Sequence, residues 1–245
     1  MTRELPEIAG VTFSRTLPSA ARWAHHLVVG LPGPCETASS APLGGGVGHH
    51  RYILNRSVDK NWRTDKPEDD PDDNEGIFSN DPGQHPDTAR YAEHLGLPAA
   101  QTVGLITAVS MANLTYAGAE REGWRVHTLV TAGVGNAAAA GGRFPLDEAL
   151  AGTVNLIVLI EGRLSPSALV GAVQTTTEAK VAAFRAAFAS KGVTTRFGKA
   201  ATGTTTDTVT VVNLTDAPRS LYAGTATAPG FLVAQTVYQA LTAAL

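Results

Sequence analysis

The clearest structural signal in the chain is Gly152-Thr153-Val154-Asn155-Leu156-Ile157-Val158-Leu159-Ile160-Glu161-Gly162-Arg163-Leu164-Ser165-Pro166. Seven of the eight residues from Thr153 to Ile160 are β-branched or aliphatic, which predicts a buried β-strand. Ser165 and Pro166 are the residue types favoured at the N-cap and first position of a helix. We expect this helix to run to about Ser190 and to end at Gly192.

Patterns on either side of this segment predict further strands and helices. The expected strands are 10–15, 23–29, 51–58, 103–109, 124–131 and 207–214, and the expected helices are 86–95 and 231–245. Strands cluster early, and strands and helices alternate later. This order predicts an α+β fold, or a mixed α/β one, with a mixed β-sheet core, helices packed on it and a single domain over residues 1–245.

Composition excludes several classes of function. The chain has 245 residues, 43% hydrophobic and 17% charged, with a net charge of −3. Without a basic excess, a nucleic-acid partner is not expected. The single cysteine, Cys35, excludes a disulfide framework and a cysteine-rich zinc module. Neither an apolar leader at Met1–Pro6 nor a run long enough to span a membrane is found, so we expect a cytoplasmic protein without a membrane partner. A homo-oligomer remains open.

The composition changes sharply between Asp65 and Glu75, where seven of eleven residues are acidic and Pro67 and Pro71 interrupt them. Like charges repel, and proline breaks both helices and strands. We therefore expect an exposed acidic loop at about residues 61–86.

The predicted helix after Ser165 carries a lysine among apolar residues. At 100° per residue one face holds Leu169, Val173, Thr176, Lys180, Phe184 and Ala187, whereas Glu178 lies on the opposite face with Gln174 and Arg185. Two interpretations remain open. Lys180 extends along the surface to reach water, or it reaches a buried polar site, because an unpaired buried ammonium is costly.

Two other polar features stand in settings typical of sites. Asn155 interrupts the apolar strand, and its amide either supports a turn or strand edge or lines a site. The segment from Ala201 to Asp207, with Thr202, Gly203 and Thr204, leads directly into a predicted strand. Its hydroxyls and N–H groups could cradle an anion or a carbonyl oxygen, although threonines before a strand are also common β-formers.

A glycine-rich segment runs from Ser39 to His50 and includes Ser40, Gly45, Gly46 and His49. Its glycines would let a ligand approach the backbone, but no Lys-Ser or Lys-Thr follows them as a phosphate-binding loop requires. On a strand, adjacent His49 and His50 point to opposite faces, so we expect no metal site.

A competing motif is Gly133-Val134-Gly135-Asn136-Ala137-Ala138, which follows a predicted strand and matches the G-x-G-x-x-A dinucleotide fingerprint. Glu161 ends the next strand, as that site would require. Gly141, Gly142 and Pro145 leave little room for the necessary helix. A dinucleotide-binding oxidoreductase is therefore the weaker alternative.

Several blocks, in order, resemble the adenosylcobinamide amidohydrolase family of cobamide salvage. They are Ser39–Ala41 with the glycines after it, Arg51–Val58 with Asn55, Ala132–Ala137, Gly152–Asn155, Thr177–Lys180, Ala201–Asp207 and Tyr222–Thr225. No block is specific alone, but their order and spacing together are. The resemblance covers residues from about 39 to 245.

The resemblance implies hydrolysis of the amide that joins the aminopropanol arm of adenosylcobinamide to the corrin ring, with adenosylcobyric acid as product. The corrinoid would be substrate, and no cofactor is expected. A non-catalytic corrinoid-binding protein is the alternative. The implied catalytic residues are Glu178, Lys180, Asp207, Asn136 and Thr204, and the implied substrate-binding residues are Ser40, Gly45, Gly46, His49, Asn55, Asn155, Thr202 and Gly203.

The polar set suggests roles that the sequence does not decide between. Glu178 or Asp207 would act as general base, on water or on a hydroxyl. Asn136, Lys180 and the N–H groups near Gly203 would stabilise the oxyanion. Thr204 or Ser40 would be the nucleophile if the reaction is covalent.

Overall fold

The computed structural model describes residues 5–17, 25–58, 86–143 and 152–245. The strands are β1 (Thr12–Arg15), β2 (His26–Ser39), β3 (Gly46–Ser57), β4 (Thr102–Thr107), β5 (Thr115–Arg121), β6 (Trp124–Ala132), β7 (Ala137–Ala138), β8 (Val154–Glu161), β9 (Arg163–Leu164), β10 (Gly203–Thr204), β11 (Thr208–Asn213) and β12 (Arg219–Ser220). The helices are α1 (Pro86–His94), α2 (Pro166–Lys191) and α3 (Ala228–Ala244), with short 3-10 turns at Ala99–Gln101 and Met111–Asn113. The predicted acidic loop lies outside the described residues.

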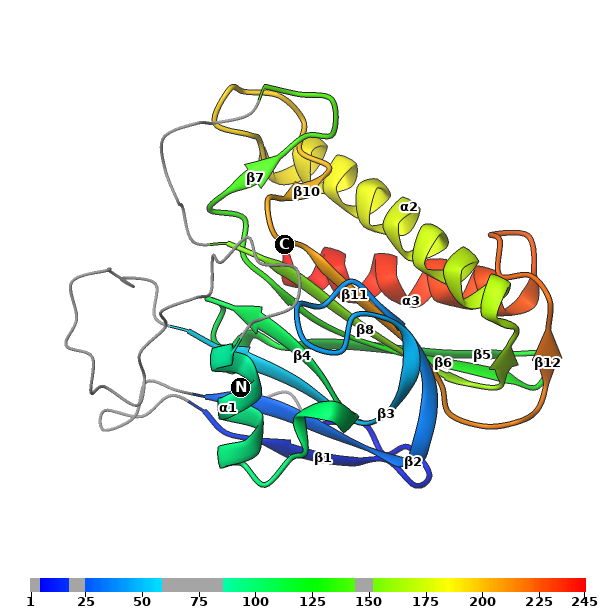
Figure 1. Ribbon diagram of the computed structural model, residues 1–245. Helices are drawn as coiled ribbons and strands as arrows, with labels where there is room; N and C mark the ends of the chain where they lie inside the picture. Colours follow the sequence, from blue (N-terminus) through cyan, green and yellow to red (C-terminus); the bar gives the residue numbers. More distant parts are fainter. Residues whose placement is uncertain (1–4, 18–24, 59–85, 144–151) are drawn as a thin grey trace.

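One mixed sheet of eight strands forms the centre of the molecule (Figure 1). Its order is β4-β3-β2-β11-β8-β6-β5, with β1 paired to β2. β8 runs parallel to β11, and β3 runs parallel to β4, whereas the other neighbours are antiparallel. The prediction of a mixed sheet with helices packed on it is confirmed.

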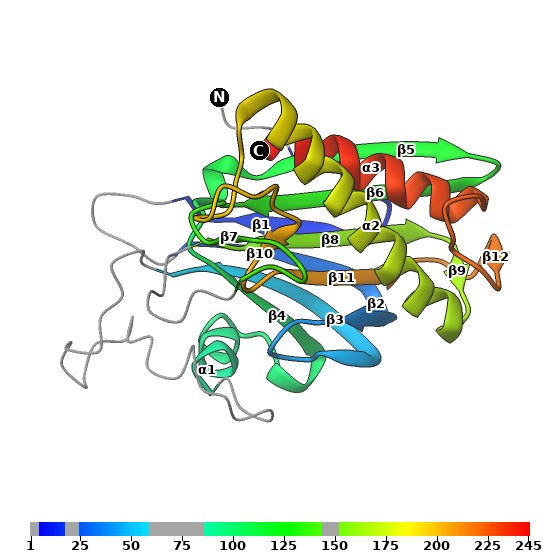
Figure 2. The same ribbon diagram turned by 90° about the horizontal axis from the view of Figure 1, so that it is seen from above.

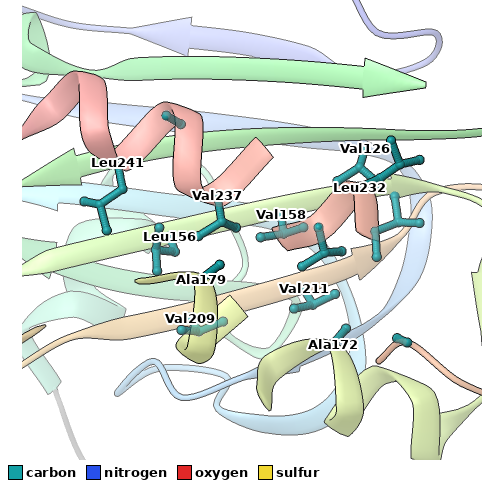
Figure 3. Close-up of a cluster of buried hydrophobic side chains, with 14 of the residues drawn as sticks. Val126, Leu156, Val158, Ala172, Ala179, Val209, Val211, Leu232, Val237 and Leu241 are labelled. Carbon is teal, nitrogen blue, oxygen red and sulfur yellow. The ribbon is translucent and has the colours of Figure 1, made fainter. Parts of the chain in front are cut away.

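Strand β8 is covered on both faces. Leu156 and Val158 point toward α2 and α3, where they meet residues such as Ala172 and Val237 (Figure 3). Ile157 and Leu159 point the other way, into a second core. Because successive side chains of a strand alternate between faces, this one segment contributes to two hydrophobic layers.

The helices α2 and α3 make the first layer. Viewed from above, they lie over β6, β8 and β11 (Figure 2). The second layer comes from the bent β2–β3 hairpin with β1 and β4. Leu27 and Ile53 from this hairpin share a core with Leu129, Ile157 and Leu159 of β6 and β8.

The bend in β2 explains one incorrect boundary. The sequence predicted a strand over 23–29, but β2 continues to Ser39. Pro32, Gly33 and Pro34 lie within β2, and the pairing of β2 with β3 shifts its register between Gly30 and Cys35. Proline cannot donate to the ladder, so the strand is interrupted there without ending.

Helix α2 begins and ends as predicted. The Ser165 hydroxyl accepts from the N–H of Ala168 at 3.2 Å, and Gly192 closes the helix with φ 68°. Its buried face holds more alanine than the predicted stripe, including Ala168, Ala172 and Ala183, whereas Val173 is half-buried. Small side chains let the helix approach the sheet closely.

Helix α3 begins earlier than predicted, at Ala228 rather than Phe231. Thr227 caps it, since its hydroxyl accepts from the N–H of Gly230 at 3.1 Å, and Pro229 occupies the first turn. None of the helices in the described ranges is long and apolar enough to cross a membrane.

Two elements differ in kind from the sequence prediction. Strand β5 was not predicted, because it is an edge strand whose polar residues and Gly118 break the alternating pattern. The G-x-G-x-x-A segment passes through a turn into the short strand β7, which pairs with β10. Residues 137–143, directly after these glycines, form β7 and a turn instead of the helix that a dinucleotide-binding site requires there, so the dinucleotide-binding interpretation is wrong.

The packing of α2 predicts different effects for two phenylalanines four residues apart. Phe184 is completely buried, whereas Phe188 is 40% exposed. We expect Phe184→Ala to lower the free energy of unfolding by about 3–5 kcal/mol through the cavity it leaves. Phe188→Ala is the matched control and should cost about 1 kcal/mol or less. Denaturant titration measures both, and equal losses would contradict this packing.

Candidate active site

An ion pair between Lys180 and Asp207 forms the centre of the candidate site. Lys180 lies midway along α2, and Asp207 immediately precedes β11. The side chains are only 12% and 9% exposed. Of the two interpretations of Lys180, the structure supports the second, because its ammonium group meets a largely buried carboxylate instead of extending into water.

The Asp207 carboxylate also accepts hydrogen bonds from the chain around it. The N–H of Thr204 lies 3.1 Å from both carboxylate oxygens, and the N–H of Val154 lies 3.2 Å from Oδ1. The Thr204 hydroxyl donates to Oδ1 as well. Asp207 is therefore held rigidly, with the Thr204 hydroxyl proton directed at it.

Lys180 and Asp207 lie so close to the backbone of Gly203 that only a residue without a side chain fits there. A Cβ atom at Gly203 would lie 2.2 Å from Asp207 Oδ2 and 2.6 Å from Lys180 Nζ. Both distances are far below van der Waals contact. A side chain at this position would force the ion pair apart, so the glycine serves close approach here.

Hydroxyl groups tie the loop before β11 to neighbouring segments. Asn136 Nδ2 donates to Thr205 Oγ1 at 2.7 Å, and Thr206 Oγ1 lies 2.8 Å from Thr153 Oγ1. Asn136 sits in the turn between β6 and β7, and Thr153 precedes β8. Thr204 contacts Asp207 directly, and Asn136 joins the same loop through Thr205, although about 70 residues separate Asn136 from it in sequence.

Thr202 holds a neighbouring turn, whereas Asn136 keeps an amide N–H that Thr205 does not use. The Thr202 hydroxyl accepts from the N–H of Ala140 at 2.8 Å, so it holds the β7 turn in place. Asn136 uses one amide N–H for Thr205 and keeps a second one. Its Oδ1 packs against Gly152, where a Cβ atom would lie 2.3 Å away.

Asn55 and Asn155 lie in the interior instead of at an accessible surface. Asn155 Nδ2 donates to Asn55 Oδ1 at 2.8 Å and to the carbonyl oxygen of Ile106 at 3.0 Å. Its Oδ1 accepts from the Thr208 hydroxyl at 2.7 Å, and Asn55 Nδ2 donates to Thr131 at 3.0 Å. Because both amides are buried and occupied, they act on a substrate only through the residues they hold.

The remaining predicted residues lie elsewhere. Ser40 exchanges bonds with Val209 of β11, whose N–H donates to Ser40 Oγ at 3.0 Å. Gly45, Gly46 and His49 are exposed where the β2–β3 hairpin turns, and Glu178 is on the exposed side of α2. Within the described ranges, no hydrogen bond joins any of these five residues to Asp207.

Four residues of the site were not predicted as members of it, namely Thr153, Val154, Thr205 and Thr206. Val154 contributes only its backbone N–H, which no side-chain pattern reveals. Thr206 was part of the threonine run, and its hydroxyl has no feature in the sequence that separates it from Thr204.

The other polar clusters form separate groups. Glu161, which ends a strand as the dinucleotide motif would require, accepts from Arg125 and His127, and His127 bonds the Tyr116 hydroxyl at 2.8 Å. Burial, and then the Glu161 charge, raise the pKa of Tyr116.

His50 is buried against Thr37, and burial followed by the charge of His49 lowers the pKa of His50. In the described ranges, no three His, Cys, Asp or Glu side chains are arranged to hold a metal ion.

The family model for adenosylcobinamide amidohydrolase matches residues 11–245. The chain belongs to this family. The match covers every residue of the Lys180–Asp207–Thr204 centre, so this centre lies within the amidohydrolase domain. No curated protein sequence matches the chain.

Two solved structures show a distant likeness to this amidohydrolase-family chain. A Burkholderia sp. β-aminopeptidase matches with a TM-score of 0.49 and 14% identity, over 97% of this chain and 84% of that one. The PH0078 protein from Pyrococcus horikoshii OT3 matches with a TM-score of 0.46 and 8% identity, over 96% and 83%. At TM-scores this low, neither likeness bears on the activity of this chain.

The geometry at Gly203 predicts a specific cost for a single methyl group. We expect Gly203→Ala to separate Lys180 from Asp207 and to lower the free energy of unfolding by about 1–3 kcal/mol, as overpacking does. Gly171→Ala is the control, because a Cβ at this α2 position meets nothing within 4 Å. It should raise stability by up to about 1 kcal/mol. Thermal unfolding of both variants is the measurement, and an unchanged Gly203→Ala would contradict the close approach.

Proposed function

We propose that this protein hydrolyses the amide between the corrin ring and the aminopropanol arm of adenosylcobinamide, which yields adenosylcobyric acid and aminopropanol. Membership of the amidohydrolase family supports this reaction. The observation that carries the proposal is the Thr204 hydroxyl, which donates to the Asp207 carboxylate beside Lys180. A hydroxyl held by a carboxylate is the arrangement that activates an oxygen nucleophile.

In the first half of the proposed reaction, Thr204 Oγ1 attacks the amide carbon and its proton passes to Asp207. The remaining N–H of Asn136 and the positive field of Lys180 stabilise the developing negative charge. Collapse of the tetrahedral intermediate breaks the C–N bond, and the leaving nitrogen takes the proton from Asp207. Aminopropanol departs, and the corrinoid acyl group remains as an ester on Thr204.

In the second half, water attacks the ester carbonyl and gives its proton to Asp207. The C–O bond to Thr204 breaks, and the proton returns to the Thr204 oxygen. The sum is amide plus water giving acid plus amine, so the enzyme regenerates itself without a further reactant. The corrinoid is substrate, and no other cofactor takes part in this proposal.

Thr204 is a better nucleophile candidate than Ser40, and Asp207 a better base than Glu178. The Ser40 oxygen accepts from the backbone N–H of Val209, whereas the Thr204 hydroxyl donates to a carboxylate. Glu178 lies on the exposed side of α2, about 160° around the helix from Lys180. A direct attack by water, with Asp207 as base, is the remaining alternative.

The exposed residues Gly45, Gly46 and His49 are proposed to contact the corrin ring instead of the scissile amide. Ser40 connects this region to the site, because it bonds Val209, two residues after Asp207. A corrin ring is wide, so a substrate with its amide at Thr204 extends onto neighbouring surface. Thr202 and Gly203 shape the backbone beside the amide.

The proposal predicts that the protein converts adenosylcobinamide without added nucleotide. Mass spectrometry should detect adenosylcobyric acid and aminopropanol, and added hydroxylamine should yield a corrinoid hydroxamate if the Thr204 ester forms. The Thr204→Val variant should form neither adenosylcobyric acid nor the hydroxamate. The Thr177→Val variant, changed on the exposed face of α2, should form both. Unchanged corrinoid bound to folded protein would favour the non-catalytic alternative. Hydrolysis without hydroxamate, retained in Thr204→Val, would assign the attack to water.

The Lys180→Met variant tests how much the ammonium charge of Lys180 contributes to catalysis. Methionine keeps the apolar stem, and Asp207 retains its donors from Thr204 and Val154, so we expect a folded protein with a small loss of stability. Turnover should fall by about a hundredfold or more, the scale of losing one oxyanion-stabilising group. Lys191→Met, at the exposed end of α2, is the control. A parental rate in Lys180→Met would remove Lys180 from the mechanism.

A further inference from the structure

Asn155 and Thr208 face each other directly across β8 and β11. Residues alternate between faces, so their neighbours Val154 and Asp207 lie one step away, on the helix side of the sheet. Two hydrogen bonds join the strands here, one through the Asn155 side chain and the other through the Asp207 side chain. Thr208 Oγ1 donates to Asn155 Oδ1 at 2.7 Å, and the N–H of Val154 donates to Asp207 Oδ1 at 3.2 Å.

This pair of bonds fixes Asp207 from both sides of the sheet. Asp207 immediately precedes the first residue of β11, and local opening of a fold costs least at such ends unless side chains anchor them. Thr208 is that anchor, because its hydroxyl is bonded inside the second core. We propose that Asn155 and Thr208 are positioning residues that set the place of the Asp207 carboxylate, an inference that rests on the proposed function.

The Asn155 amide is itself held by the second layer of the fold. It donates to Asn55 of β3 and to the carbonyl oxygen of Ile106 in β4, and Asn55 donates in turn to Thr131 of β6. The neighbours Ile157 and Leu159 on this face are apolar. A fully satisfied polar network inside an apolar face specifies one arrangement of its members, which is the property a positioning device needs.

This inference differs from direct substrate binding in what a mutation changes. Asn155 is completely buried and every polar atom of its side chain is bonded, so it makes no contact that would set KM. A displaced carboxylate lowers kcat instead, because small misplacements of catalytic groups are costly. Thr208→Val removes only the hydroxyl and keeps the shape of the side chain.

We expect Thr208→Val to lower kcat by about tenfold or more with KM within about twofold of the parent. Thr208→Ser, which restores the hydroxyl, should recover most of kcat. The control is Thr128→Val, since Thr128 is equally interior and its hydroxyl lies 2.8 Å from that of Thr236 on the helix side. It should lose similar stability and keep kcat. A kcat loss no larger in Thr208→Val than in Thr128→Val, or a raised KM with intact kcat, would overturn the proposal.

A second measurement needs no turnover. An amine-reactive acylating reagent followed by mass spectrometry reports how freely Lys180 leaves Asp207, with exposed Lys191 as internal reference. Labelling of Lys180 should rise at least about threefold in Thr208→Val and Asn155→Ala, and not in Thr128→Val. Unchanged labelling would reject the positioning role. If the parent protein leaves adenosylcobinamide intact while labelling rises as expected, the proposed function fails and the positioning of Asp207 stands.

Discussion

The burial of β8 on both faces is the constraint on which the rest of the structure depends. A strand with Val154, Leu156 and Val158 on one side and Ile157 and Leu159 on the other cannot lie at a surface. Helices α2 and α3 cover the first side. The second side is covered by the chain's own β2–β3 hairpin, which reaches it through the interruption at Pro32–Pro34. Two layers around one strand follow from that single requirement.

The candidate site lies where β8 and its parallel neighbour β11 begin. There the ladder supplies the N–H of Val154 to Asp207, and α2 supplies Lys180 from the layer above. A largely buried carboxylate is stable only if donors surround it. The Thr204 hydroxyl is one of these donors, so the arrangement that satisfies Asp207 is also the one that activates Thr204.

The loops of the site are held by hydroxyl and amide side chains more than by packing. Thr202, Thr205 and Thr206 each bond a different segment, and Asn136 bridges the turn after β6 to the loop before β11. Such bonds contribute little net stability individually, yet each leaves a polar group unsatisfied when broken. Their number explains why threonine is concentrated in this segment.

The sequence by itself determined the elements with strong local signals. The apolar run of β8, the Ser165–Pro166 cap and Gly192 predicted the central strand and the full extent of α2, because periodicity and capping are local properties. The polar residues of the threonine loop and Lys180 were also identifiable as unusual for their surroundings. Strand β5 and the length of β2 were not, since edge exposure and a bend across prolines are decided by neighbours elsewhere in the chain.

Only the tertiary structure decided which polar residues meet. Lys180 and Glu178 were both candidates, but the face of α2 that packs on β11 brings Lys180 alone to Asp207. Asn55 and Asn155, a hundred residues apart, bond each other inside the second core, which placed them behind the site instead of at its surface. Hydrogen bonds of this kind join segments distant in sequence, and their partners depend on how the layers stack, a relation that no local pattern of residues contains.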